Sequence, residues 1–471
     1  MGMPLDSYSL PSRSTLVQRC QDRDWLVFQD GAGEVAAYSH QRFWNSLENL
    51  AQSLAKTALS GPPLCIREPH PWRCLTAILA ALVEHRPVVL TNPQWGSQEW
   101  QQVGDLIHPD WSAPLVSGVG CYPCRRLAPV QTADIWIPSG GSGGELRFVG
   151  HSWATLMAAV QGFRRHFGVE VVDAYCVLPL YHVSGLMQAL RVLASGGCLA
   201  LQSYGDLKRE TWLPFPQNSF LSLVPTQLQW LLAQGDRYLP RLQTYRAVLL
   251  GGAPAAPLLL DQARQQSIPL APTYGMSETA SQVATLLPQE FLAGHQSSGR
   301  CLPHVHLEII NDQGDCLAPG AVGAIALETP CLFWGYWPPL PTPRQERFVT
   351  DDLGYLDDQG YVHVLGRRST TIITGGEKVL PQEVEQLLLA TGQLADVCVV
   401  GLADPHWGQC LCALIVPGLN FLGLDPLISL VRYQLASYKQ PKRWLVVAAI
   451  PRTTEGKLRR GMALALAQER A

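Results

Sequence analysis

Lysine is scarce in this sequence, which has only six, at positions 56, 208, 378, 439, 442 and 457. Lysine and arginine together number 35 against 38 aspartates and glutamates, so the formal net charge at pH 7 is −3. A chain with that balance has no broad positive field to attract nucleic acid or anionic lipid. We therefore expect no nucleic-acid partner, and any anionic ligand must be held by a local site.

Long apolar runs are missing as well. No stretch approaches the roughly 18 apolar residues that a membrane span needs. The N-terminus, MGMPLDSYSL, has no basic region followed by an apolar run, which is the pattern of a secretory signal. We expect a protein without a membrane span that is located in the cytoplasm.

The cysteines show no repeating spacing. There are 13 of them, and an odd number scattered along a long chain argues for reduced thiols rather than a disulfide framework. A single CxxC, Cys121 to Cys124, has no second pair. A loop beside Pro123 is the simpler interpretation of this pair, and a zinc or redox site is the alternative.

The order of apolar segments predicts an α/β protein with two domains. From about residue 133 to 275, short apolar runs alternate with helical patterns such as the one that starts at Ser152, which predicts mostly parallel sheets covered by helices. Residues 299–366 contain only short strands and turns, typical of a small antiparallel β-barrel or sheet. We predict an N-terminal domain over 1–367, including that barrel-like subdomain, and a mobile α+β lid domain over 368–471.

A run of small residues, Ser139-Gly140-Gly141-Ser142-Gly143-Gly144, follows the apolar segment ADIWIP. Glycines let a backbone turn its N–H groups toward a phosphate, and serine hydroxyls can add hydrogen bonds. No Gly-Lys-Ser/Thr closes the run, so it is not a Walker loop. By itself the pattern fits a phosphate-binding loop or a flexible connection.

Three further motifs contain charged residues that could bind a nucleotide. In TYGMSE, Glu278 could hold a magnesium ion and Tyr274 could cover a flat base, or the segment could be a simple turn. In TDDLGY, an aspartate could accept hydrogen bonds from both ribose hydroxyls, or only from backbone N–H groups of its turn. In PRTTEGK, Lys457 could neutralise charge on an α-phosphate, or lie exposed on the surface.

Taken together and in this order, the motifs resemble those of the adenylate-forming superfamily, which contains acyl-CoA synthetases, peptide-synthetase adenylation domains and luciferases. The resemblance covers roughly residues 130–460 and includes the GRxLP turn at 299–303, the GRRS hinge and GGEKVLPQEVE. Within the superfamily the chain is most similar to o-succinylbenzoate-CoA ligases of menaquinone or phylloquinone synthesis. The run LPLYHVSG over 178–185, Ser369 at the hinge and Thr279-Ala280-Ser281 indicate this.

The resemblance implies an enzyme that uses ATP, magnesium and coenzyme A to activate a carboxylic acid as its acyl-AMP and to form the thioester. It implies that the phosphates of ATP are cradled by Ser139, Gly140, Gly141, Ser142 and Gly143. It implies that the nucleotide is also contacted by Gly251, Gly252, Ala253, Pro254, Tyr274, Gly275, Met276, Ser277, Asp352 and Arg367. Asp352 would bind the ribose, and Gly375 and Gly376 would face the site only during thioester formation.

The resemblance also implies three catalytic residues. Glu278 would bind magnesium, Lys457 would serve adenylation, and His182 would pack beside an aromatic acyl group or orient its carboxylate. Related proteins usually carry a Pro-Lys pair just after the glycine loop, where this chain has Glu145-Leu146-Arg147-Phe148. Arg147 could replace the lysine, although a planar guanidinium is not an equivalent point charge.

Several alternatives remain at this point. The chain could be another aryl- or acyl-CoA ligase, an enzyme that loads a carrier protein in trans, or a nucleotide-binding paralogue without catalysis. Assembly into a homodimer is left open.

The substitution Lys457→Ala tests the role that the resemblance implies for this residue. We expect it to abolish acyl-AMP formation, because the α-phosphate loses its positive partner, and to spare thioester formation from supplied acyl-AMP. Separate assays of the two half-reactions check this. Equal loss of both would contradict a model in which one lid serves two arrangements.

Overall fold

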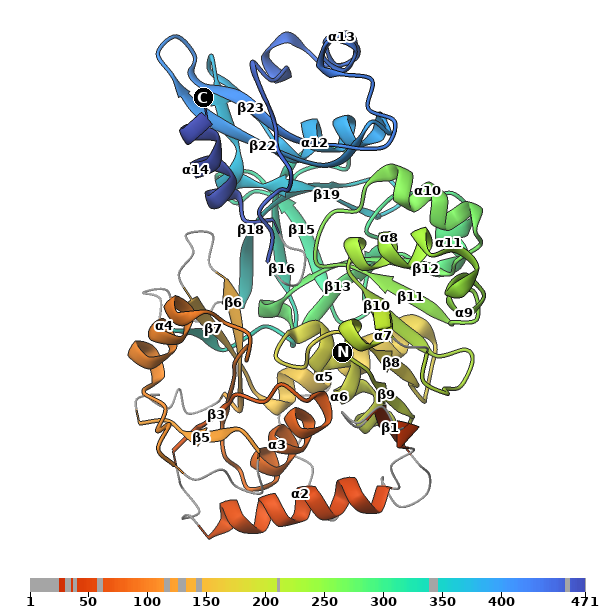
Figure 1. The fold of residues 1–471 in the computed structure, drawn as a ribbon, viewed down its shortest axis with the longest axis vertical. Helices are drawn as coiled ribbons and strands as arrows, with labels where there is room; N and C mark the ends of the chain where they lie inside the picture. The colour runs from red at the N-terminus through yellow and green to blue at the C-terminus, as the bar shows by residue number, and fades with distance from the viewer. Residues whose placement is uncertain are drawn as a thin grey trace.

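The computed structural model describes residues 25–29, 35–36, 40–56, 62–113, 119–125, 133–140, 146–209, 212–338, 346–453 and 458–470. Strands within these ranges assemble into a nine-stranded, a six-stranded, a four-stranded and a five-stranded sheet. Figure 1 shows the C-terminal part, in blue, at the upper end of the molecule, next to β18 and β19. The glycine-loop residues Gly141, Ser142 and Gly143, and Lys457, lie outside the described residues.

The largest sheet confirms the predicted strand–helix alternation. Its neighbouring strands from β12 through β11, β10, β8 and β9 to β1 are parallel, and the strands at both ends are antiparallel. In spatial order the strands are β14 (Arg300–Cys301), β13 (Ser281–Thr285), β12 (Leu270–Met276), β11 (Ala247–Leu250), β10 (Phe220–Leu223), β8 (Ala174–Cys176), β9 (Leu199–Leu201), β1 (Leu26–Gln29) and β2 (Val35–Ala36).

The six-stranded sheet contains a strand that the sequence analysis did not anticipate. In spatial order it consists of β17 (Gly335–Trp337), β7 (Leu146–His151), β6 (Ile135–Gly140), β4 (Val88–Leu90), β3 (Leu64–Ile66) and β5 (Cys121–Pro123). The segment LRFVGH of β7 pairs antiparallel with β6, so the two strands flank the glycine loop. Its last four residues are all buried, which removes the alternation by which a half-exposed strand is recognised. Cys121 begins β5, so the CxxC is not simply a loop.

Two helices pack between these sheets. α5 (Trp153–Phe167) and α6 (Val183–Ser195) share one buried cluster with Ile135 and Ile137 of β6 and with Leu199 of β9. Ser152, where the sequence pattern places the start of this helix, is the N-cap of α5, and its hydroxyl accepts a hydrogen bond from the Thr155 amide at 3.3 Å. The other described helices of this part are α2 (His40–Ala55), α3 (Pro71–Val83), α4 (Ser97–Ile107), α7 (Tyr204–Arg209), α8 (Pro225–Ala233), α9 (Leu239–Leu242), α10 (Pro257–Gln265) and α11 (Pro288–Leu292).

The expected barrel is an open sheet. Residues 299–366 contribute the strands β15 (His306–Ile310), β16 (Gly323–Glu328), β18 (Arg347–Leu356) and β19 (Val362–Arg367), which pair antiparallel in that order. Among the described residues the two outer strands, β15 and β19, do not pair with each other, so the sheet does not close. Helix α12 (Pro381–Ala390) contacts β19, and its Gln382 lies directly against Gly366.

The C-terminal part is an α+β unit, as predicted, with a core of its own. Its sheet comprises β21 (Glu377–Val379), β20 (Ile372–Thr374), β23 (Gly408–Pro417), β22 (Leu394–Asp404) and β24 (Arg443–Val446). α12 and α13 (Leu424–Gln434) pack on it through residues such as Val384, Leu388 and Leu427, and α14 (Arg460–Arg470) packs elsewhere on it through Ala463 and Ala467. No helix in the described ranges is long and apolar enough to cross a membrane.

Helix α6 depends on a close backbone contact at its first turn. A Cβ atom added at Gly185 would lie 2.2 Å from the carbonyl oxygen of Pro179, whereas one added at Gly104 in α4 would meet nothing within 4 Å. We expect Gly185→Ala to lower the free energy of unfolding by about 2 kcal/mol. Gly104→Ala, the matched control, should raise it by up to about 1 kcal/mol, because alanine is the better helix former. Urea unfolding of both variants checks this, and equal effects would contradict it.

Candidate functional site

The first part of the site joins two sheets. Tyr274 lies on β12 and is buried, and its hydroxyl donates a hydrogen bond to Oδ2 of Asp352 on β18 at 2.8 Å. Arg367, opposite Asp352 in the β18–β19 ladder, places its Nε 3.4 Å from Oδ1. The structure therefore brings together three residues that are far apart in the sequence. The Asp352 carboxylate is held in place by one phenol and one guanidinium.

The ionisation of Tyr274 is suppressed by its surroundings. Burial raises the pKa of Tyr274 well above its ordinary value, and the negative charge of Asp352 raises it further. The phenol consequently remains a hydrogen-bond donor to the carboxylate over the whole physiological pH range.

The second part of the site surrounds Glu278, which lies in the short 3-10 helix η3 (Ser277–Thr279) directly after β12. The hydroxyl of Tyr336, on β17, donates to its Oε1 at 2.8 Å. Burial and the Glu278 carboxylate raise the pKa of Tyr336, whereas the positive charge of Arg147 lowers it. Arg147 therefore acts on the same group of side chains as Glu278, consistent with its position opposite Ser139 at the end of β6.

The segment around Glu278 is anchored and strained. The Nε2 atom of His151, a fully buried residue, lies 2.7 Å from the Ser277 carbonyl oxygen. Immediately after η3, Ala280 and Ser281 have φ values of 49° and 101°, which L residues rarely adopt. The close approach of Gly275 to the backbone of Ser281, where a Cβ would lie 2.0 Å from the carbonyl oxygen, allows this tight return of the chain. Such strain persists where packing fixes it, often at functional sites.

A buried arginine that the sequence analysis missed lies next to this segment. Arg191 of α6 is 3% exposed, and its Nη2 donates to Oε1 of Gln282 at 2.8 Å and lies 3.4 Å from the Ser281 hydroxyl. Its guanidinium stacks on Phe163, 4.0 Å from the ring centroid. Among the described residues no carboxylate pairs with it, and burial lowers the pKa of Arg191 to about 9. The sequence contains a signal for this residue, because Arg191 is the single charged residue in the apolar helical segment LMQALRVL, and a charge buried there needs a polar partner.

Other predicted residues lie at neighbouring strand ends. Gly251, Gly252, Ala253 and Pro254 follow β11, which is parallel to β12 with Leu250 opposite Pro272, so they lie beside Thr273 and Tyr274. A Cβ at Gly251 would lie 2.5 Å from the Thr273 hydroxyl. Met276 ends β12, and Ser139 and Gly140 end β6. His182 is the N-cap residue of α6, with its ring 4.8 Å from that of Tyr181.

The residues predicted to belong to a lid lie in two separate places. Gly375 and Gly376 form the turn between β20 and β21, where the Gly375 amide donates to the Trp407 carbonyl, and no described contact joins them to Glu278 or Asp352. The segment that follows Lys457 lies elsewhere, because Nη2 of Arg459 is 3.9 Å from Oε1 of Glu99 on α4. On the same helix, Gln102 accepts a hydrogen bond from the Leu146 amide, the first residue of β7. Arg459 and the first residue of β7 thus both contact α4.

Two family models match the chain. One, described as AMP-binding enzyme, matches residues 127–337, and the other, described as AMP-binding enzyme C-terminal domain, matches residues 383–457. Both matches fall within the region where the motifs resemble the adenylate-forming superfamily.

Individual relatives and solved structures agree with the family models. The chain is 36% identical over 380 residues to 2-succinylbenzoate–CoA ligase of Geobacillus kaustophilus, covering 76% of each chain. It is 33% identical over 348 residues to the enzyme of the same name from Listeria innocua, covering 72% of this chain and 70% of the other. The structure of O-succinylbenzoate coenzyme A synthetase from Bacillus subtilis with ATP and magnesium superposes with a TM-score of 0.79 at 25% identity, covering 96% and 98%.

The Tyr274–Asp352 hydrogen bond can be tested by Tyr274→Phe. We expect a loss of about 1–2 kcal/mol in the free energy of unfolding at pH 7–9, because the carboxylate loses a donor. The folded-state pKa of Tyr274 is raised, so its contribution is complete below the ordinary tyrosine pKa of about 10 and is lost as the pH rises through the folded value. The difference between the two proteins should therefore narrow above about pH 10. Urea unfolding across this range checks the trend, and a widening difference would refute it.

Proposed function

The chain belongs to the AMP-binding enzyme family, and from this premise we propose that it is an ATP-dependent ligase that forms o-succinylbenzoyl-CoA and AMP from o-succinylbenzoate and coenzyme A. The names of the similar ligases from Geobacillus and Listeria support this substrate. The observation that carries the proposal within this chain is the buried Arg191 beside Ser281, close in sequence to Glu278.

A buried guanidinium without a protein carboxylate suits a substrate with two carboxylates. One carboxylate of o-succinylbenzoate must react with ATP, and the other must be bound without reacting. Arg191 can supply a charged donor for the second one, because its Nε has no hydrogen-bond partner among the described residues, while Nη2 is oriented by the neutral Gln282 and Ser281. The aromatic part of the substrate would lie between Arg191 and Glu278, near His182.

We assign the nucleotide to the strand ends around Tyr274. The carboxylate of Asp352 has oxygens for the ribose hydroxyls, and the residues from Gly251 to Pro254, with Tyr274 to Ser277, would border the adenine. Arg367 would approach the ribose or the phosphates. Ser139 and the glycine loop would cradle the phosphates, with Arg147 as an additional positive charge near Glu278.

The donor set fits a magnesium ion. Glu278 has one oxygen engaged by Tyr336, which leaves the other for a metal, and the described residues contain no cluster of three or more His, Cys, Asp or Glu ligands. Magnesium is usually held by one or two carboxylates together with phosphates and waters rather than by an all-protein cage. A bound magnesium ion would neutralise phosphate charge during adenylation.

For the first half-reaction, the protein must place two anions against each other. The substrate carboxylate attacks the α-phosphorus and pyrophosphate leaves, so catalysis depends on position and on positive groups near the phosphate oxygens. Arg191 and His182 would orient the acid, Asp352 would fix the ribose, and Lys457 would stabilise charge on the α-phosphate. In the second half-reaction the thiol of coenzyme A attacks the acyl carbonyl and AMP leaves.

We propose that the two half-reactions use different orientations of a lid comprising residues 368–471, joined to a domain of residues 1–367. The contact between Arg459 and Glu99 supports an orientation suited to adenylation, because Arg459, two positions after Lys457 in the sequence, meets α4, the helix whose Gln102 also bonds the first residue of β7. Rotation at Ser369 would withdraw Lys457 and bring Gly375 and Gly376 to the site. We further propose action in the cytoplasm, within menaquinone or phylloquinone synthesis, and leave a homodimer open.

Pyrophosphate release tests the function and the role of Arg191 together. We expect ATP-dependent release with o-succinylbenzoate, and its CoA thioester when coenzyme A is added, but little turnover with benzoate, a cinnamate, a medium-chain fatty acid or an analogue that lacks the second carboxylate. Arg191→Leu should lower kcat/KM for o-succinylbenzoate by about 100-fold, because a buried charged partner is removed.

The exposed ion-pair residue Arg209 provides a control, since Arg209→Leu also removes one positive charge and should leave kcat/KM unchanged. Turnover of a different acid would show that the protein is a ligase of this class but that o-succinylbenzoate is not its substrate. Absence of pyrophosphate release across the panel, with ATP still bound, would refute the proposed function. Unchanged kcat/KM in Arg191→Leu would remove this arginine from substrate binding.

A further inference from the structure

Two adjacent aspartates on β18 point to different parts of the molecule. Side chains alternate along a strand, so Asp351 and Asp352 project from opposite faces. Asp352 faces Tyr274 of the N-terminal part, whereas Asp351 contacts Ser369 at the start of the C-terminal part. Of the two, only Asp352 was assigned a role from the sequence.

Asp351 binds both hydrogen-bond donors of Ser369. The Ser369 amide donates to Oδ1 at 3.1 Å, and the Ser369 hydroxyl donates to Oδ2. Ser369 lies in the one-turn 3-10 helix η4 (Arg368–Thr370), which immediately follows β19. A carboxylate that holds the amide and the side chain of one residue fixes the backbone and the χ1 angle of that residue together.

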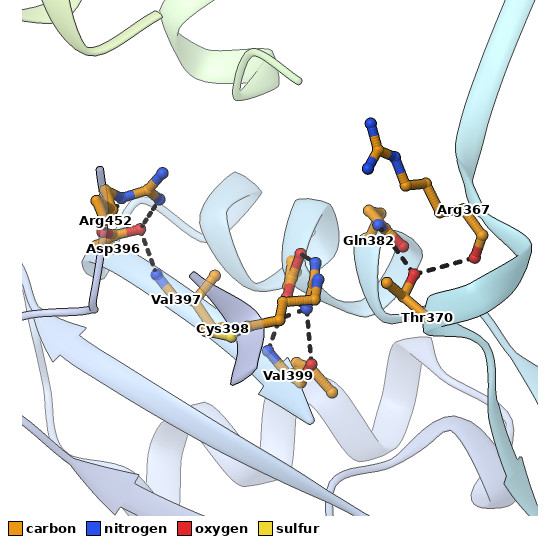
Figure 2. A network of polar contacts seen from close by, with 10 residues as sticks. Arg367, Thr370, Gln382, Asp396, Val397, Cys398, Val399 and Arg452 are labelled. Atoms are coloured by element: carbon orange, nitrogen blue, oxygen red, sulfur yellow. Dashed lines mark hydrogen bonds and ion pairs between the residues drawn. The ribbon is translucent and has the colours of Figure 1, made fainter. Parts of the chain in front are cut away.

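Ser369 is the point at which the chain leaves the four-stranded sheet. Arg367 still belongs to the ladder, opposite Asp352. Beyond it, the Thr370 hydroxyl donates to the Arg367 carbonyl at 3.0 Å and accepts from Gln382 of α12 at 3.4 Å, as Figure 2 shows. Figure 2 also shows Arg452 paired with Asp396, which ties the chain preceding Lys457 to β22 of the lid, with its Nε 2.9 Å from Oδ2. A turn at Ser369 would therefore carry Arg452 along with the lid.

We propose that Asp351 is a positioning residue that holds Ser369, and with it the lid, in the orientation used for adenylation. This inference rests on the proposed function. A change of φ or ψ at Arg368, or of φ at Ser369, would move the N–H or the Cβ of Ser369 relative to β18, so the two hydrogen bonds cannot both persist through a rotation at these angles. Asp351 thus releases Ser369 when the lid turns for thioester formation.

The effect should be moderate because both residues are exposed. Charge-assisted hydrogen bonds in water are partly replaced by bonds to solvent, so loss of the pair should change the balance of orientations by roughly 3- to 10-fold. A latch of that strength favours one orientation without preventing the other.

The test measures the two half-reactions separately in Asp351→Ala. We expect the rate of ATP–pyrophosphate exchange to fall roughly 3- to 10-fold relative to the rate of thioester formation from supplied acyl-AMP. Ser369→Ala should change the same ratio in the same direction, and the double variant should add little to Asp351→Ala, because the two residues act as one unit.

Asp312 offers a matched control. Its Oδ1 lies 3.7 Å from Nη1 of Arg368, which is the first residue of η4. Asp312 makes no hydrogen bond to Ser369. Asp312→Asn should leave the ratio of half-reaction rates unchanged. A thermal unfolding midpoint within a few degrees of wild type establishes that the variants are folded. An unchanged ratio in Asp351→Ala, or the same shift in Asp312→Asn, would overturn the proposal.

Amide hydrogen exchange gives a readout that does not require turnover. Asp351→Ala should accelerate exchange in the peptide that contains the Ser369 amide, and Asp312→Asn should not. If the wild-type protein released no pyrophosphate with any acid, the proposed function would fail, while faster exchange would still support the contact as a latch. Normal turnover with no change in exchange or in rate ratio would refute the latch alone.

Discussion

The hydrogen bond between the Tyr274 hydroxyl and the Asp352 carboxylate joins the nine-stranded sheet to the four-stranded sheet. Tyr274 is near the end of β12, so Glu278 follows within one turn, and Asp352 is paired in the ladder with Arg367 at the end of β19. The positions of Glu278 and Asp352, and of the end of β19 from which the chain continues into the C-terminal part, therefore depend on how these two sheets meet. A shift of one residue in either strand would turn the side chains to the opposite faces.

The chain has almost no net charge, and its site uses few charged groups that are each fixed by neutral neighbours. Arg191 is held by Gln282, Ser281 and the face of Phe163, and Glu278 is held by Tyr336. Neutral donors and acceptors orient a charge without cancelling it, which leaves the charge available to a ligand. This arrangement suits an enzyme that must bind anions locally.

The C-terminal part has apolar clusters of its own, which is what the proposed turning of this part as a unit requires. Its sheet encloses separate apolar clusters, and Arg460 pairs with Glu385 through two hydrogen bonds of 2.7 Å within the unit. Two of the contacts that join it to the remaining structure are polar: Ser369 with Asp351, both exposed, and the exposed Arg459 with the half-buried Glu99. Breaking such contacts costs little compared with disrupting a core, which is the physical basis of the proposed movement at Ser369.

The sequence by itself determined the strand–helix alternation, the α+β C-terminal unit and the positions of the motifs around Glu278 and Asp352, because each of these depends on local periodicity or on short runs of residues. Tertiary structure decided the rest. β7 is buried along most of its length and has no alternation, and the described strands β15 and β19 do not pair, so their sheet stays open. The partners of Arg191 and Asp351 come from distant segments, Gln282 and Ser369, and no local pattern specifies contacts between residues so far apart in the chain.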